Sequence, residues 1–233
     1  MSIQSMLNEN NLCGYHVDSG SIDRAITYLN WEHEFFDYPN MVALDTITDG
    51  SCFFHAIVQG FYKPYIQGYY EELEHPIDKK RFVRNFRKDL AFMLDSTKSY
   101  IDDDLQSWYE YLSRGKLKEN SKDLSKYSLQ NMRRELDSNK PVDNMYLEFV
   151  SELLNLDIYI LDGNSERPYI TGNDNDILYK GRKSIVILYE NFHYSTVGIE
   201  NDNNIKTIFS PFHPFIQYIN EKTDEMRKSG TLL

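Results

Sequence analysis

Residues 45–57 read DTITDGSCFFHAI and contain Cys52, one of the two cysteines of the chain. Asp49-Gly50 favours a turn, and the apolar residues after Cys52 recur at the spacing of a buried helix face. The stretch therefore predicts a turn, followed by a helix that begins at the cysteine. A thiol in the first helical turn lies near unpaired N–H groups and the positive end of the dipole, which favour its thiolate. Gly50 is expected to allow a close backbone approach or a positive φ.

A histidine far downstream is the matching candidate for a base. His193 enters a strand-like run, FHYSTV at residues 192–197, and only folding can bring it to Cys52. Cysteine catalysis needs a thiolate, an imidazole within hydrogen-bond reach and a group that orients the imidazole. The residues alone leave two interpretations open. Cys52 is either a nucleophile or a small buried hydrophobic residue at the start of an apolar helix.

The composition predicts one sizeable domain, with or without a small appendage. The chain has 233 residues, of which 41% are hydrophobic and 14% aromatic, enough for a core without disulfides. Its two cysteines, Cys13 and Cys52, are too few for a structural zinc site or a disulfide framework. Free thiols are typical of a reducing compartment.

The net charge and the N-terminal residues indicate which partners and which cellular location to expect. The net charge is −11, whereas nucleic-acid binders normally carry a basic face, so we expect no nucleic-acid partner. Residues 1–11 lack the pattern of a secretory signal, and no apolar run approaches the ~18 residues of a membrane span. We expect a soluble cytoplasmic protein without a membrane partner, located in the host cytoplasm if it is an injected effector or a viral protein.

Helical patterns occupy the chain up to about residue 154. Apolar residues recur at helical spacing over residues 21–36, with Asp18 or Ser19 as the cap, and again over 52–62 and 78–94. Shorter helices are expected over 102–112 and 123–136. Asp143 is expected to cap a further helix.

The pattern then changes to a period of two. Residues 157–161 predict a strand, residues 184–189 and 192–197 predict a hairpin, and 205–209 predict another strand. From residue 211 onward we expect an irregular tail with a short helix. Helices first and strands later are typical of an α+β fold, with a small sheet against a helical lobe.

Three blocks of the sequence resemble the ovarian tumour (OTU) family of cysteine proteases. Residues 49–56, DGSCFFHA, resemble the Asp-Gly-x-Cys-x-x-x-Ala signature of the family. Residues 143–161, an amphipathic helix that runs into LDIYIL, resemble its middle block. Residues 185–194, IVILYENFHY, resemble its terminal block, in which an aromatic residue follows the base histidine. The three blocks stand in the order that the family has.

The resemblance implies a papain-like OTU fold over residues 43–210, an α+β domain with a small, mostly antiparallel sheet between helical lobes. Residues 1–42, which lie outside the resembling blocks and include the helical pattern over 21–36, are expected to form a helical extension that contacts ubiquitin, and residues 211–233 a C-terminal tail. Cys52 and His193 would be the nucleophile and base of a deubiquitinase, and Asp49 would shape the oxyanion hole. The implied partners are ubiquitin or polyubiquitin chains, and no cofactor is implied.

The group that orients the base departs from the pattern of the family. The family usually has Asp or Asn two residues after the histidine, whereas this chain has Ser195, whose hydroxyl is a weaker acceptor. Some members instead use an acid from before the cysteine block. Asp45, Asp37 and Asn191 are the local candidates, and we favour an upstream acid over Ser195.

Other polar residues have simpler explanations. His55 is a second base candidate by proximity, but packing fits it better because its side chain would point along the helix. The Asp102-Asp103-Asp104 run fits a solvated helix start, or a substrate-binding surface that attracts the arginines in the tail of ubiquitin. The remaining histidines show no ligand spacing, so no metal site is expected.

Two alternative functions stay open. The chain could be an OTU-fold module that binds ubiquitin with little or no cleavage, which Ser195 in place of Asp or Asn would favour. It could also apply the same thiol chemistry to another ubiquitin-like modifier.

Overall fold

A computed structural model describes residues 3, 6–7, 16–31, 35–70, 75–98, 106–119, 127–142, 144–169 and 178–230. Its α-helices are α2 (Cys52–Phe61), α3 (Lys63–Gln67), α4 (Lys79–Met93), α5 (Trp108–Glu119), α6 (Leu129–Leu136), α7 (Leu147–Leu154) and α9 (Pro214–Ser229). Short 3₁₀ turns are η1 (Ser19–Ser21) and η3 (Asn144–Tyr146). Small two-stranded ribbons pair β4 (Tyr69–Tyr70) with β5 (His75–Pro76) and β6 (Thr97–Lys98) with β7 (Gln106–Ser107).

Within the described residues, nine strands form one mixed sheet. Its members are β1 (Val17–Asp18), β2 (Ile26–Tyr28), β3 (Met41–Leu44), β8 (Asp157–Asp162), β9 (Arg167–Pro168), β10 (Ser184–Glu190), β11 (His193–Asn201), β12 (Asn204–Lys206) and β13 (Ile208–Phe209). Only the β8–β10 pair is parallel among the pairings of this sheet, and all the others are antiparallel. The predicted α+β class with a mostly antiparallel sheet is confirmed.

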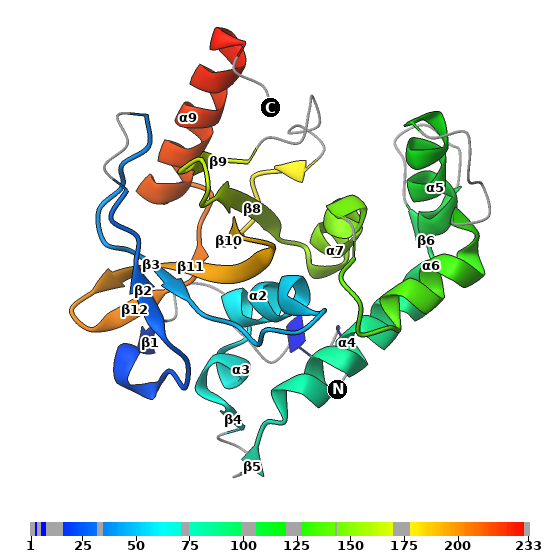
Figure 1. Cartoon of the computed structure of the whole chain (residues 1–233), viewed down its shortest axis with the longest axis horizontal. Coiled ribbons are helices and arrows are strands. Elements are labelled where there is room, and N and C mark those ends of the chain that lie inside the picture. The colour runs from blue at the N-terminus through cyan, green and yellow to red at the C-terminus, as the bar shows by residue number, and fades with distance from the viewer. Residues whose placement is uncertain are drawn as a thin grey trace.

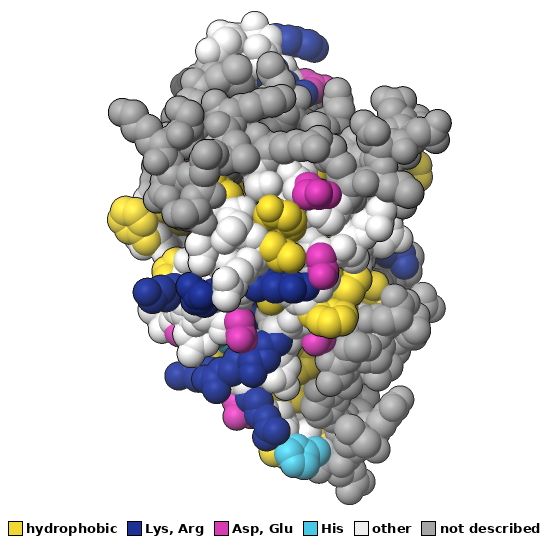
Figure 2. Space-filling view, turned by 90° about the vertical axis from the view of Figure 1, so that its right-hand side faces the viewer, with side chains coloured by type: hydrophobic (Ala, Val, Ile, Leu, Met, Phe, Trp, Pro, Cys, Tyr) yellow, Lys and Arg dark blue, Asp and Glu magenta, His cyan; other side chains and the backbone are white. Residues whose placement is uncertain are grey.

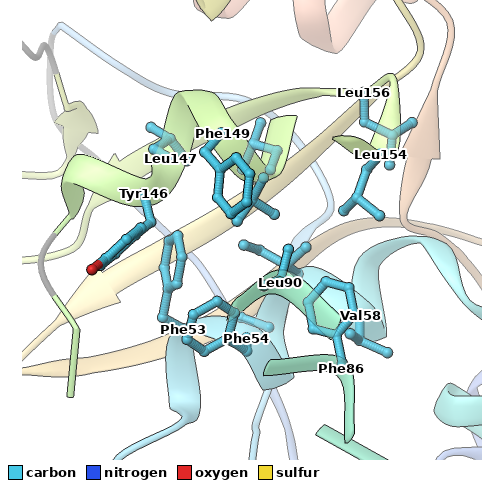
Figure 3. Close-up of a cluster of buried hydrophobic side chains, with 14 of the residues drawn as sticks. Phe53, Phe54, Val58, Phe86, Leu90, Tyr146, Leu147, Phe149, Leu154 and Leu156 are labelled. Carbon is cyan, nitrogen blue, oxygen red and sulfur yellow. The ribbon is translucent and has the colours of Figure 1, made fainter. Parts of the chain in front are cut away.

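Two hydrophobic clusters cover the two faces of this sheet. Because side chains alternate along a strand, β10 sends Ile185 and Ile187 into one cluster and Val186 and Leu188 into the other. The first cluster is built with α2, α4 and α7, and Figure 3 shows phenylalanines of α2 and α4 meeting the side chains of α7. The second is covered by α9 and by residues 31 and 35–41. In Figure 1, α9 and α2 accordingly lie on different sides of the strands.

Local patterns predicted the central elements correctly. The α2 and α4 helices occupy the expected ranges, and the Asp78 carboxylate caps α4 by accepting from the Arg81 N–H at 3.0 Å. The β10–β11 hairpin and β8 also form as predicted. The α5 and α6 helices begin at Trp108 and Leu129, later than expected, and the residues from 102 to 105 and from 123 to 126 lie outside the described residues, as does Asp143.

The helix predicted over residues 21–36 is wrong. The segment holds η1, with Asp18 accepting from the Gly20 N–H, and then β2, which pairs with β3 along its edge. Sheet pairing outweighs helical spacing here because β3 lies between β2 and β11 and is fully buried. Of residues 1–42, residues 3, 6 and 7 are helical, whereas no α-helix forms in the described part of 21–36; the division of the chain at residues 42 and 210 stays a prediction.

The C-terminal segment also differs from the expected irregular tail. Residues 214–229 form α9, a helix of 16 residues with Pro214 in its first turn and His213 as its cap. Its buried side chains pack on the second cluster, where the Phe215 and Tyr38 rings lie 4.8 Å apart. The Tyr218 hydroxyl accepts from the Asp37 N–H at 2.9 Å. The segment before β3 and the C-terminal helix thus cover the same face of the sheet.

The surface around α4 shows that the overall charge does not describe each face. Although the net charge is −11, the exposed face of α4 carries basic residues at positions 80, 81, 84 and 88. Figure 2, which faces the side of the molecule that carries α4 and α6, shows Lys and Arg side chains in bands. No described helix is long and apolar enough to cross a membrane.

Candidate active site

The turn before α2 places Cys52 at the first residue of the helix, as predicted from the sequence. The Asp49 carboxylate accepts from the Ser51 N–H at 2.7 Å, and the Asp49 carbonyl accepts from the Cys52 N–H at 3.3 Å. Cys52 is only 8% exposed. Asp49 therefore shapes the turn that carries the thiol, and its predicted part in an oxyanion hole stays a prediction.

Gly50 is required by a close approach between two parts of the backbone. A Cβ atom at this position would lie 1.8 Å from the carbonyl oxygen of Asn139. Its φ is not among the positive values of the described residues. Of the two reasons expected for this glycine, the close approach is confirmed and the positive φ is wrong.

Arg87, a residue that the sequence analysis missed, holds this turn in place. It lies on α4 with 1% of its surface exposed. Its Nη1 donates to the Gly50 carbonyl at 3.2 Å and to Ser51 Oγ at 2.7 Å. Nε and Nη2 donate to carbonyls at the end of α6 and just beyond it, those of Leu136, Glu135 and Lys140. One guanidinium thus joins the nucleophile turn to the end of α6, and burial lowers its pKa to about 10.

His193 begins β11, and its ring contacts residues that follow β3. His193 Nε2 lies 3.3 Å from Asp45 Oδ1 and 3.3 Å from Thr46 Oγ1. Thr46 Oγ1 in turn donates to the Tyr194 carbonyl at 2.6 Å. The antiparallel pairing of Leu44 with Thr196 brings these residues together, because β3 ends and β11 begins at the same end of the sheet. Thr46 is a second contact that the sequence analysis did not identify.

The other candidates for the orienting group lie elsewhere. Among the described residues no hydrogen bond involves the Ser195 hydroxyl, and Asn191 is exposed in the hairpin turn. Asp37 lies near Tyr218 of α9. Of the residues proposed from the sequence, only Asp45 contacts the imidazole of His193 in the described part of the chain.

The thiol of Cys52 lies against the strand that carries the histidine. A backbone hydrogen bond from Tyr194, the residue after His193, lowers the pKa of this thiol, as does one from Phe53. Desolvation by burial is the larger effect, and repulsion from Asp49 adds to it, so the pKa of Cys52 is raised above its ordinary value. In this state of the protein the thiol is the favoured form.

His55 is part of the core beneath the site and is not a base. It is fully buried, and its Nδ1 hydrogen-bonds to the Tyr65 hydroxyl. Its Nε2 lies 3.5 Å from Asp49 Oδ2. Burial outweighs this carboxylate and lowers the pKa of His55 to about 4, so the ring is neutral at physiological pH. The packing interpretation of His55 is confirmed.

Two other features concern possible ligands. Asp102, Asp103 and Asp104 lie outside the described residues, so their role as a surface for a basic tail stays a prediction. Within the described ranges, no group of three or more His, Cys, Asp or Glu side chains is arranged to hold a metal ion.

Comparisons with known proteins find similarity in structure but not in sequence. No protein-family model matches the chain, and no curated protein matches it. The structure is similar to an ovarian tumour (OTU) domain solved in complex with ubiquitin, at 15% identity and a TM-score of 0.46, covering 83% of this chain and 90% of that one. It is also similar to the viral OTU domain protease of Farallon virus, at 14% identity and a TM-score of 0.34, covering 76% of this chain and 99% of that one.

Proposed function

We propose that the chain is a cysteine-type deubiquitinase, with Cys52 as nucleophile, His193 as base and Asp45 as the group that orients His193. One observation carries the proposal. The thiol at the start of α2 lies against the backbone of Tyr194, while the preceding residue, His193, is held through Nε2 by Asp45. Ubiquitin is proposed as the substrate because the three sequence blocks resemble the OTU family.

The contact with Asp45 determines which nitrogen of His193 is the base. A carboxylate accepts hydrogen bonds, so the contact at 3.3 Å places the proton of the neutral ring on Nε2. Nδ1 then has a free lone pair, and among the described residues no protein group hydrogen-bonds to it. Nδ1 is therefore the atom that accepts the thiol proton, and Asp45 stabilises the imidazolium that forms.

The reaction follows from these roles. The Cys52 thiolate attacks the carbonyl of the terminal glycine of ubiquitin, and the tetrahedral intermediate collapses as His193 protonates the departing lysine amine. Water, deprotonated by His193, then hydrolyses the thioester and releases the ubiquitin carboxylate. N–H groups of the turn at residues 49–52 are the proposed oxyanion donors. Because Cys52 is buried, small residues such as glycine next to the scissile bond fit the site best.

A ubiquitin probe with a C-terminal electrophile tests this assignment. The full chain should form a covalent adduct that Cys52→Ala abolishes and Cys13→Ser retains. Cys52→Ala should still bind ubiquitin, because it removes one atom from a buried site. Cleavage of diubiquitin by Cys52→Ala would exclude Cys52 as the nucleophile.

A ubiquitin-binding module with little or no activity is the second candidate, favoured by the raised pKa of Cys52. Iodoacetamide alkylation in a Cys13→Ser background measures the thiolate population. With a raised pKa, the rate should increase about tenfold per pH unit from pH 6 to 9 without a plateau. The ubiquitin probe then separates the two functions, because a module that only binds ubiquitin leaves Cys52 unlabelled.

A further inference from the structure

The turn that precedes His193 contains an aromatic residue in an unfavourable backbone conformation. The pairing of Glu190 with His193 closes the β10–β11 hairpin and leaves Asn191 and Phe192 as its two-residue turn. Their φ values are +49° and +64°. Two positive φ values define the mirror-image turn common in hairpins, in which asparagine suits the first position and glycine the second. Phenylalanine at the second position is strained because its Cβ crowds the backbone.

The side chain of Phe192 is not used in the fold. It is 90% exposed, the highest value among the large hydrophobic residues that the structure describes. An exposed ring buries almost no apolar surface, so packing does not compensate for the strained backbone. Neither local conformation nor the core therefore explains a phenylalanine here. Strain and exposure together, next to the candidate base, indicate a contact with another molecule.

The hairpin is held firmly on both sides of this turn. The Gly163 N–H donates to the Tyr189 carbonyl at 2.9 Å, and a Cβ on Gly163 would lie 2.9 Å from Cβ of Glu190. The Tyr194 ring lies 4.9 Å from the Tyr189 ring and 5.2 Å from the Phe53 ring of α2. Phe192 is thus presented at a fixed place relative to the first turn of α2.

We infer that Phe192 contacts the polypeptide that leaves in the reaction, the protein or ubiquitin whose lysine carries the scissile isopeptide bond. This inference rests on the proposed function. His193 must donate a proton to the departing amine, so the leaving group has to lie against the imidazole. Phe192 is the residue immediately before His193 and points its ring into solvent at that end of β11. The chemistry of the contact is apolar, which calls for an exposed aliphatic or aromatic surface beside the modified lysine.

The inference predicts that Phe192 distinguishes between leaving groups. Ubiquitin linked to aminocoumarin has a small leaving group, whereas diubiquitin has a polypeptide. In Phe192→Asn, kcat/KM should fall about tenfold for the diubiquitin linkage that the wild type cleaves fastest, since a buried aromatic contact is lost. The aminocoumarin value should stay within twofold. Phe192→Trp should retain diubiquitin cleavage because it keeps the aromatic surface.

Asparagine is chosen because it tolerates a positive φ, so the melting temperature should not fall. Phe212→Asn is the matched control, since Phe212 is 80% exposed and follows β13, which pairs with the opposite end of β10. It should leave both rates unchanged. Equal losses on both substrates, or no loss on diubiquitin, would overturn the leaving-group contact. Failure of the proposed function gives a different result, because the wild type would then cleave neither substrate and would not react with the ubiquitin probe. That result would overturn the leaving-group contact as well.

Discussion

The two halves of the candidate site are held in opposite ways. The turn and first helical residues over 49–55 are fixed by buried polar contacts, above all the hydrogen bonds of Arg87 and the packing of His55. The turn end of the hairpin that carries the base lies at the surface, where the side chains of His193 and Asp45 are 25% and 46% exposed. The nucleophile is therefore positioned by the folding of the core, and the base by local contacts at its edge.

This difference separates stability from activity. A change beneath Cys52 leaves buried polar groups without partners, so it should appear first in the free energy of unfolding. The groups around His193 are already partly exposed, so water replaces the hydrogen bonds that a substitution removes. Such a change should therefore appear first in kcat. The variants below test whether the two halves differ in this way.

Arg87→Met should have the largest effect. It removes the arginine donor from the Gly50 carbonyl, from Ser51 Oγ and from three carbonyls at or just beyond the end of α6. We expect the free energy of unfolding to fall by about 3–5 kcal/mol, as measured by urea denaturation.

Arg133→Met is the matched control for Arg87→Met. Arg133 also donates to backbone carbonyls, those of Ala91 and Phe92, and pairs with Asp95, but its side chain is 36% exposed. Water replaces these contacts, so the loss should be about 1 kcal/mol or less. Similar losses for both arginines would contradict the view that the nucleophile half depends on a buried network.

Asp45→Asn should reduce kcat about 100-fold, because an amide cannot stabilise the imidazolium as a carboxylate does. The free energy of unfolding should change by less than about 0.5 kcal/mol, since Asp45 is half exposed. Steady-state cleavage of ubiquitin-aminocoumarin and urea denaturation measure the two quantities.

Ser195→Ala provides the comparison, because Ser195 occupies the position where the OTU family usually has its orienting residue. Its hydroxyl makes no hydrogen bond among the described residues, so kcat should change less than twofold. A larger loss in Ser195→Ala than in Asp45→Asn would transfer the orienting role to Ser195.

The sequence predicted elements whose signals are local. A turn dipeptide before a run of helical period identified α2, and a period of two identified the β10–β11 hairpin. The prediction of a helix over residues 21–36 failed because their apolar residues have helical spacing, whereas β2 within this segment forms by pairing with β3, which comes later in the sequence. The residues of α9 follow an amphipathic pattern, but the two prolines of this segment indicate an irregular tail, and one of them, Pro214, in fact begins the helix.

Contacts between segments that are distant in the sequence could not be predicted from it. Asp45 was on the short list, but choosing it required the register between β3 and β11. Arg87 had a weak signal, since it falls on the face of α4 that carries Val83, Phe86 and Leu90. An arginine on an apolar helix face indicates a buried guanidinium, yet its five acceptors come from two other segments that only folding brings together.

The last prediction concerns the pH dependence of the nucleophile half. Burial lowers the pKa of His55 to about 4, below its ordinary value near 6.5, so the unfolded chain binds a proton that the folded chain does not. The resulting stabilisation is complete above about pH 6.5 and is lost as the pH falls toward 4, with a slope of up to about 1.4 kcal/mol per pH unit. His55→Gln, which does not titrate, should flatten the dependence of unfolding free energy on pH by one proton in this range, as measured by urea denaturation at several pH values. Carboxylates titrate in both proteins and cancel in the difference. An unchanged slope would mean that His55 is protonated in the fold, paired with Asp49, and that the nucleophile half contains a buried ion pair in place of a neutral ring.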